Sequence, residues 1–127
     1  MPAWKKLYGM IWLNFFTLLL ACFHGIPFHA WVHSLVGFAV LVLAVHNQKI
    51  LAATPCPDRI KRIAAAMVAV GVLGALTGVP IMLSLPTWLV GILKFLHLTA
   101  IAALFTQSAS VATSHDMWEQ KEFEPKA

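Results

Sequence analysis

The stretch HAWVHSLVGFAVLVLAVHN (residues 29–47) decides the fold, because it is an almost unbroken apolar run. A transmembrane helix needs about 20 mostly apolar residues, and this run is long enough. Histidines stand near both of its ends, at His29 and His46, and His33 lies four residues after the first. We therefore predict a membrane-spanning helix that carries titratable, metal-binding side chains at its ends.

The composition of the whole chain agrees with a membrane protein. Of its 127 residues, 60% are hydrophobic and only 11% are charged, whereas about a quarter are charged in a typical soluble domain. The length allows a single domain, covering residues 1–127. The net charge of +4 does not indicate nucleic-acid binding, because the basic residues flank apolar segments instead of forming a soluble basic face.

The apolar segments predict four membrane spans, which cover residues of about 7–23, 30–47, 63–83 and 90–113. The connections before the second and fourth spans are short, and the middle one, residues 48–62, is longer and contains Pro55 and Pro57. Short connections make consecutive helices antiparallel neighbours. The predicted fold class is therefore all-α, an integral membrane four-helix bundle.

Lysine and arginine predict the orientation of the bundle. Lys5 and Lys6 precede the first span, four basic residues lie in residues 48–62, and the two short connections contain none. Cytoplasmic loops are enriched in such residues. We therefore expect the N- and C-termini and the middle connection to be cytoplasmic, in a multi-pass protein of the inner membrane with a short cytoplasmic tail.

The two cysteines do not predict a disulfide. Cys22 lies at the outer end of the first span and Cys56 in the cytoplasmic middle connection, on opposite sides of the membrane in this topology. No CxxC or CxxCH motif is present, which excludes thioredoxin-type chemistry and covalent c-type haem attachment. We expect two free thiols.

The positions of the histidines point to a cofactor site. An ionisable residue inside a membrane is costly and is a functional candidate, and imidazole ligates haem iron, zinc and copper. A haem between helices needs one histidine from each of two helices at matched depth. His33 in the second span and His97 in the fourth are the candidate pair, and Gly37, one turn after His33, would leave clearance for a flat group.

The depth match depends on where the fourth span begins. If it begins at Lys94, both His33 and His97 lie about one turn, ~5 Å, below the outer ends of their spans. Residues 87–93 would then lie along the membrane surface, anchored by Trp88. If it begins at Thr87, His97 lies about 15 Å deep and the match is lost. The sequence leaves both registers open.

Three stretches carry a family resemblance: HSLVGFAVLVLAVHN (residues 33–47), Thr77-Gly78 in the next span, and FLHLTAIAALF (residues 95–105). They resemble the small four-helix b-type membrane cytochromes of the cytochrome b561-like superfamily. The resemblance implies haem b held by His33 and His97, with electron transfer to or from quinone or other redox subunits of a larger complex.

The chain departs from the two-haem members of that superfamily, which use two histidines on each ligating helix. His46 follows His33 by 13 residues, a rotation that places the two about 140° apart. Ser110 stands where a second histidine would follow His97. The resemblance therefore implies one haem, near the extracytoplasmic side.

Several other interpretations of the polar residues stay open. His46, beside Asn47, fits the end of a helix, where the helix dipole favours it. His115 fits a solvated surface position. His33 and His97 fit hydrogen bonds to a neighbouring helix in a cofactor-free structural or assembly subunit. The glycines of GALTG (residues 74–78) fit either close helix packing or room for a cofactor.

A surface metal site is a further alternative. His29 and His33 are four residues apart, so both imidazoles can reach one ion. His24, across the short connection, would be a third ligand, and three imidazoles suit copper or zinc.

No motif predicts a catalytic centre. The sequence contains no GxSxG, no HExxH, no phosphate-binding loop and no carboxylate within a span. Proton pumps normally need buried carboxylates, so a primary pump is disfavoured. The protein is at most an electron-transfer subunit of an oxidoreductase, and the tail MWEQKEFEPKA (residues 117–127) is a cytoplasmic extension that could dock a partner.

Overall fold

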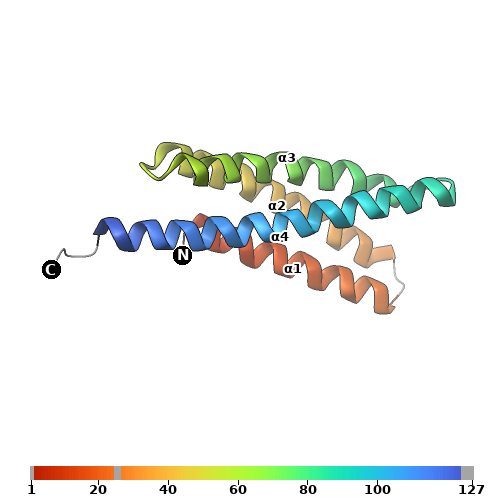
Figure 1. Cartoon of the computed structure of the whole chain (residues 1–127). Helices are drawn as coiled ribbons and strands as arrows, with labels where there is room; N and C mark the ends of the chain where they lie inside the picture. Colours follow the sequence, from red (N-terminus) through yellow and green to blue (C-terminus); the bar gives the residue numbers. More distant parts are fainter. Residues whose placement is uncertain (1, 25–26, 124–127) are drawn as a thin grey trace.

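A computed structural model of the chain describes residues 2–24 and 27–123 (Figure 1). Within these residues the chain forms four helices: α1 (Ala3–His24), α2 (Pro27–Ala53), α3 (Asp58–Ile81) and α4 (Thr87–Phe123). The predicted all-α four-helix bundle is confirmed. Three helical segments are long and apolar enough to cross a membrane, namely Ala30–Ala53, Asp58–Ile81 and Thr87–Glu122.

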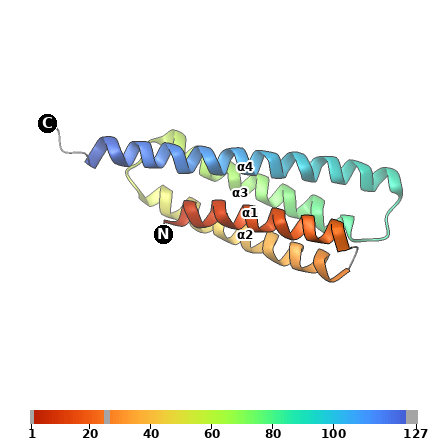
Figure 2. The same ribbon diagram turned by 90° about the horizontal axis from the view of Figure 1, so that it is seen from below.

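The four helices form two packed hairpins. α1 lies against α2, and α3 lies against α4, and these are the two most extensive interfaces. α2 also contacts α3, and α1 contacts α4 less extensively, so α2 and α4 stand on a diagonal of the bundle (Figures 1 and 2). The start of α1, the connection between α2 and α3, and the end of α4 gather at one end of the molecule.

The middle connection is shorter than the sequence indicates. Residues 48–62 were expected to be a loop, but α2 continues to Ala53 and α3 begins at Asp58. The expectation was wrong because Lys, Gln, Arg and Ala are good helix formers, so the helices continue where the charges begin. Cys56, in the short connection, is a free thiol, as expected, and it is buried. The side chain of Cys22 lies outside those that the structure describes.

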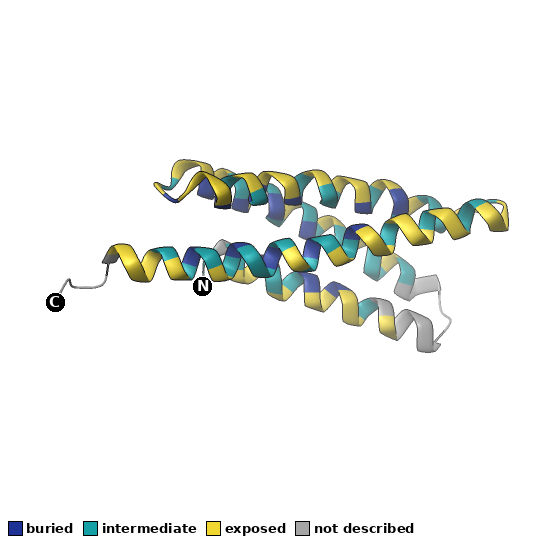
Figure 3. Cartoon of the chain, in the orientation of Figure 1, coloured by how far each residue is buried: buried dark blue, intermediate teal, exposed yellow. Residues whose placement is uncertain are grey.

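Burial changes along α2 and α4 from one end of the bundle to the other (Figure 3). Among the residues whose burial is described, the buried ones on α2 lie at or after Val40, and those on α4 lie at or after Ala100. On α3, Gly74 and Thr77 beside His97 are buried as well. We call the end that carries residues 40–53 of α2 and 100–115 of α4 the closed half. The end that carries residues 30–39 of α2 and 87–99 of α4 is the open half.

Candidate functional site

His33 and His97 meet in the open half of the bundle. His33 lies on α2 and His97 on α4, the two helices on the diagonal. Their ring centroids are 6.2 Å apart, and the ring planes are inclined at 77°. Both side chains are half-buried. The structure thus brings together the two residues that the sequence pairs.

The rings meet although α4 begins at Thr87. α4 is one continuous helix from this residue, so the chain does not form a separate segment over residues 87–93, which was one of the two alternatives that the sequence leaves open. The number of residues between a helix start and its histidine does not give the relative depth of His33 and His97, because the start of α4 lies beyond the start of α2 (Figure 1). This shift of α4 along the bundle compensates for the larger number of residues between Thr87 and His97.

The imidazole of His33 is anchored to α1 by its Nδ1. This atom lies 3.1 Å from the backbone oxygen of Asn14 and 3.4 Å from Oγ1 of Thr17. A carbonyl oxygen only accepts hydrogen bonds, so Nδ1 carries the proton and donates it. Thr17 donates its own hydroxyl to the same oxygen of Asn14, at 2.7 Å.

His97 is anchored to α3 in the same way. Its Nδ1 lies 2.9 Å from the backbone oxygen of Gly74 and 3.4 Å from Oγ1 of Thr77. Each hairpin therefore presents a backbone carbonyl, a threonine three residues later, and a histidine from the following helix. In the neutral form of such an imidazole Nε2 keeps its lone pair, and among the described residues no hydrogen bond to either Nε2 is found.

Two glycines lie close to the side chains of this site. A Cβ on Gly78 would lie 2.7 Å from Cε1 of His97, so the ring rests directly on the backbone of α3. A Cβ on Gly37 would lie 3.2 Å from Nδ2 of Asn14. Gly78 thus makes room for the imidazole itself, and Gly37, the expected clearance residue, gives room to the side chain of Asn14.

Sequence reasoning missed the carbonyl and hydroxyl partners. Backbone oxygens leave no trace in side-chain patterns, and Thr17 and Thr77 are ordinary residues of apolar helices. The available signal was Asn14, the lone carboxamide within the first apolar segment, and the Thr77-Gly78 pair in the third.

The remaining histidines lie elsewhere. His46 is exposed, and seven residues of α2 follow it, so it does not lie at a helix end as expected. His115 was expected to be solvated, but it is buried, with 3% of its surface exposed. The expectation was wrong because α4 continues past residue 113 and packs His115 against Trp4 of α1. The side chains of His24 and His29 lie outside those that the structure describes, so the three-histidine surface site stays a prediction.

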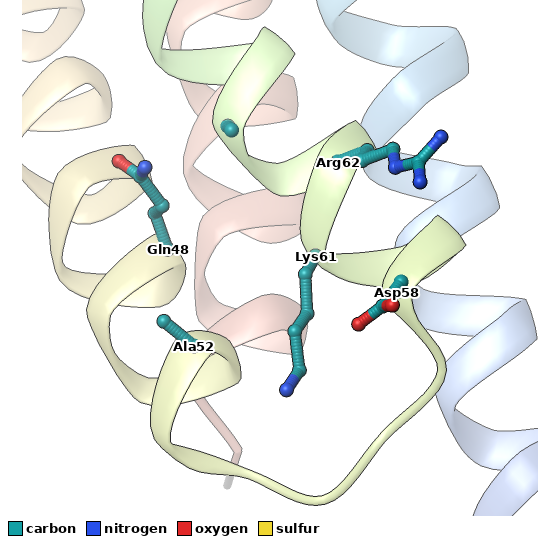
Figure 4. Close-up of a pocket in the computed structure, with 6 residues that line it drawn as sticks. Gln48, Ala52, Asp58, Lys61 and Arg62 are labelled. Carbon is teal, nitrogen blue, oxygen red and sulfur yellow. The ribbon is translucent and has the colours of Figure 1, made fainter.

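An open pocket at the opposite end of the molecule is a poor alternative site. It lies between α2 and α3, and Gln48, Ala52, Asp58, Lys61 and Arg62 line it (Figure 4). Its charged side chains are exposed or half-buried, as expected of a solvated helix end. No histidine lines it.

Comparison with known proteins adds no second line of argument. No protein-family model matches the chain, and no curated protein or solved structure matches it. The functional interpretation therefore depends on the geometry of His33 and His97.

Proposed function

We propose that the protein is an integral membrane b-type cytochrome-like subunit that transfers electrons through one haem b near the extracytoplasmic side. His33 and His97 would hold the haem iron. The observation that carries the proposal is the pairing of two imidazoles whose centroids are 6.2 Å apart and whose Nδ1 atoms both donate to backbone carbonyls.

The separation of the rings fits two ligands of one metal ion. Metal–imidazole bonds are about 2 Å long, and a ring nitrogen lies about 1 Å from the ring centre, so two imidazoles that hold one ion would have centroids no more than about 6 Å apart. Metal-binding histidines almost always donate their other ring N–H to a carbonyl or carboxylate. Asn14 and Gly74 already provide those carbonyls for His33 and His97.

The burial pattern of α2 and α4 around the two histidines supports the proposal. Among the described residues, neither residues 30–39 of α2 nor residues 87–99 of α4 include a buried side chain. In the closed half, by contrast, Val40, Ala44, Leu104 and other side chains fill the centre. A bound haem would supply one-electron transfer, and the two carbonyl contacts would orient the rings of His33 and His97 and hold the proton on Nδ1, so that Nε2 is the nitrogen left for the metal.

The proposal involves one haem and external partners. His46 is exposed and the ring of His115 stacks on Trp4, so neither is arranged like His33 and His97. The connection between α3 and α4 is short, and so is the one between α2 and α3. Such a chain offers little surface outside the membrane, so its electron partners would be other membrane subunits or a quinone in the lipid.

The test is a reduced-minus-oxidised optical spectrum of the detergent-purified protein produced with ample haem. We expect a sharp b-type α-band that is lost in both His33→Ala and His97→Ala. The matched control is His46→Ala, which removes an exposed histidine of α2 and should leave the band unchanged. A flat spectrum of the parent protein, or a band that survives both substitutions, would end the proposal.

A cofactor-free structural or assembly subunit is the second candidate, and the same hydrogen bonds support it. They tie α2 to α1 and α4 to α3, and 6.2 Å is also within the range of an edge-to-face contact of two rings. In that case His33→Ala and His97→Ala would lower the thermal stability of a protein that never shows a chromophore.

A further inference from the structure

A second group of ligand-type side chains lies near the end of α4, remote in sequence from His33 and His97. His115, Asp116 and Glu119 are the first, second and fifth residues of HDMWE (residues 115–119). One ring nitrogen of His115 and one carboxylate oxygen from each acid all lie within 4.8 Å of one another. Glu119 lies about one helical turn after both His115 and Asp116, so its carboxylate can approach either side chain.

The imidazole of His115 has an unmet hydrogen-bonding requirement. The residue is 3% exposed, and its Nδ1 is buried without a hydrogen-bond partner. Buried polar atoms in proteins are nearly always paired, so an unpaired one needs an explanation. A metal ion bound to Nδ1 would provide this explanation.

The surroundings hold the ring of His115 in place. It stacks on Trp4 at a centroid distance of 3.8 Å and contacts Trp118 at 5.3 Å. Trp4 belongs to α1 and Trp118 to α4, so the ring is fixed between two helices. A pre-oriented imidazole loses little rotational freedom when it binds an ion.

A cation already lies at the edge of this group. Nζ of Lys5 is 3.2 Å from Oδ2 of Asp116, with both side chains substantially exposed. Exposed ion pairs of this kind contribute little stability. A divalent ion would interact more strongly with Asp116 and Glu119 together, and Lys5 would compete with it for Asp116.

We propose that His115, Asp116 and Glu119 form a binding site for a divalent transition-metal ion of the zinc class, with Lys5 as the competing cation. One imidazole nitrogen and two carboxylate oxygens are ligands that Zn²⁺ accepts, and water would complete the coordination. This site is independent of the haem proposal, because it shares no residue with it.

The test uses the full-length protein in detergent after chelator treatment, titrated with Zn²⁺ by calorimetry and with Co²⁺ by visible absorption. We expect a tight site that depends on Glu119, and Co²⁺ bands of a bound ion. Glu119→Gln should weaken binding by about tenfold or more. Glu122→Gln, which removes an exposed acid one turn further along α4, should change the affinity by less than about twofold.

Two further variants separate this site from other histidines and from nonspecific charge. The double variant His24→Ala/His29→Ala should retain the site, and Lys5→Met should tighten it several-fold by removing the competing ammonium group. Equal affinities for Glu119→Gln and Glu122→Gln, or loss of binding in the double variant, would overturn the proposal. Because Glu119 is exposed, its substitution does not threaten the fold.

Discussion

The closed half and the open half of the bundle use the same four helices in different ways. In the closed half, side chains such as Leu7, Leu51, Met67 and Val111 are almost fully buried. In the open half, α2 and α4 contribute no buried side chain among the described residues, and His33 and His97 meet near the centre. The difference indicates that the closed half contributes most of the buried apolar side chains that stabilise the fold.

The largest expected effect separates the two halves directly. Leu51 is 0% exposed and Leu35 is 72% exposed. Leu51→Ala should lower the free energy of unfolding by about 3 kcal/mol, through lost burial and a cavity, whereas Leu35→Ala should change it little. Thermal unfolding of both variants in detergent, followed by circular dichroism, measures this. Equal losses at the two positions would show that the halves do not differ in this way.

The next largest effect sharpens the role of the open half. In Gly78→Ala the new Cβ would lie 2.7 Å from Cε1 of His97, so the ring must move off the carbonyl of Gly74. Overpacking of this kind costs about 1–3 kcal/mol, and any chromophore should be lost or shifted in its spectrum. Gly91→Ala is the matched control, because a Cβ there meets nothing within 4 Å. If both variants behaved alike, the close approach of His97 to α3 would be wrong.

A smaller effect is expected from the threonines that flank the two carbonyls. Thr17→Val and Thr77→Val each remove a hydroxyl 3.4 Å from an imidazole Nδ1. Each should cost about 0.5–1.5 kcal/mol and, under the proposed function, should shift the midpoint potential of the haem. The control is Thr106→Val, whose hydroxyl bonds only to its own helix, at Ala102. An unchanged potential in both variants would exclude a role for these hydroxyls in positioning the ligands.

The smallest effect concerns the ion pair at the end of the closed half. Lys5→Met removes the exposed contact with Asp116. Such pairs contribute at most about 1 kcal/mol, so the melting temperature should shift only slightly. A large loss of stability would mean that this pair, and not the apolar packing around it, holds α1 to α4. The same variant doubles as the competition test for the proposed metal site.

The sequence predicted well where physics acts locally. Apolar runs such as residues 29–47 define helices, because backbone groups in an apolar environment must be paired within one segment. The short connections predicted antiparallel neighbours, and the histidines of the second and fourth segments were the natural pair to examine. These inferences depend on local composition and spacing, which a sequence records directly.

The sequence predicted less well where contacts join distant segments. The burial of His115 depends on Trp4, more than a hundred residues earlier in the chain. The sequence places His46 near a helix end because charged residues follow it, whereas α2 continues to Ala53. In both cases the sequence shows how polar a segment is, but not which distant segments pack against it.

The sequence by itself determined an all-α chain with four apolar helices, a segregated charge pattern and two candidate ligand histidines. Only the tertiary structure decided that His33 and His97 meet, that the carbonyls of Asn14 and Gly74 fix their Nδ1 protons, and that Gly78 admits the ring of His97. The physical reason is that periodicity specifies which face of a helix is apolar. The relative shift and splay of the helices, which set the distances between side chains, result from the packing of all four together.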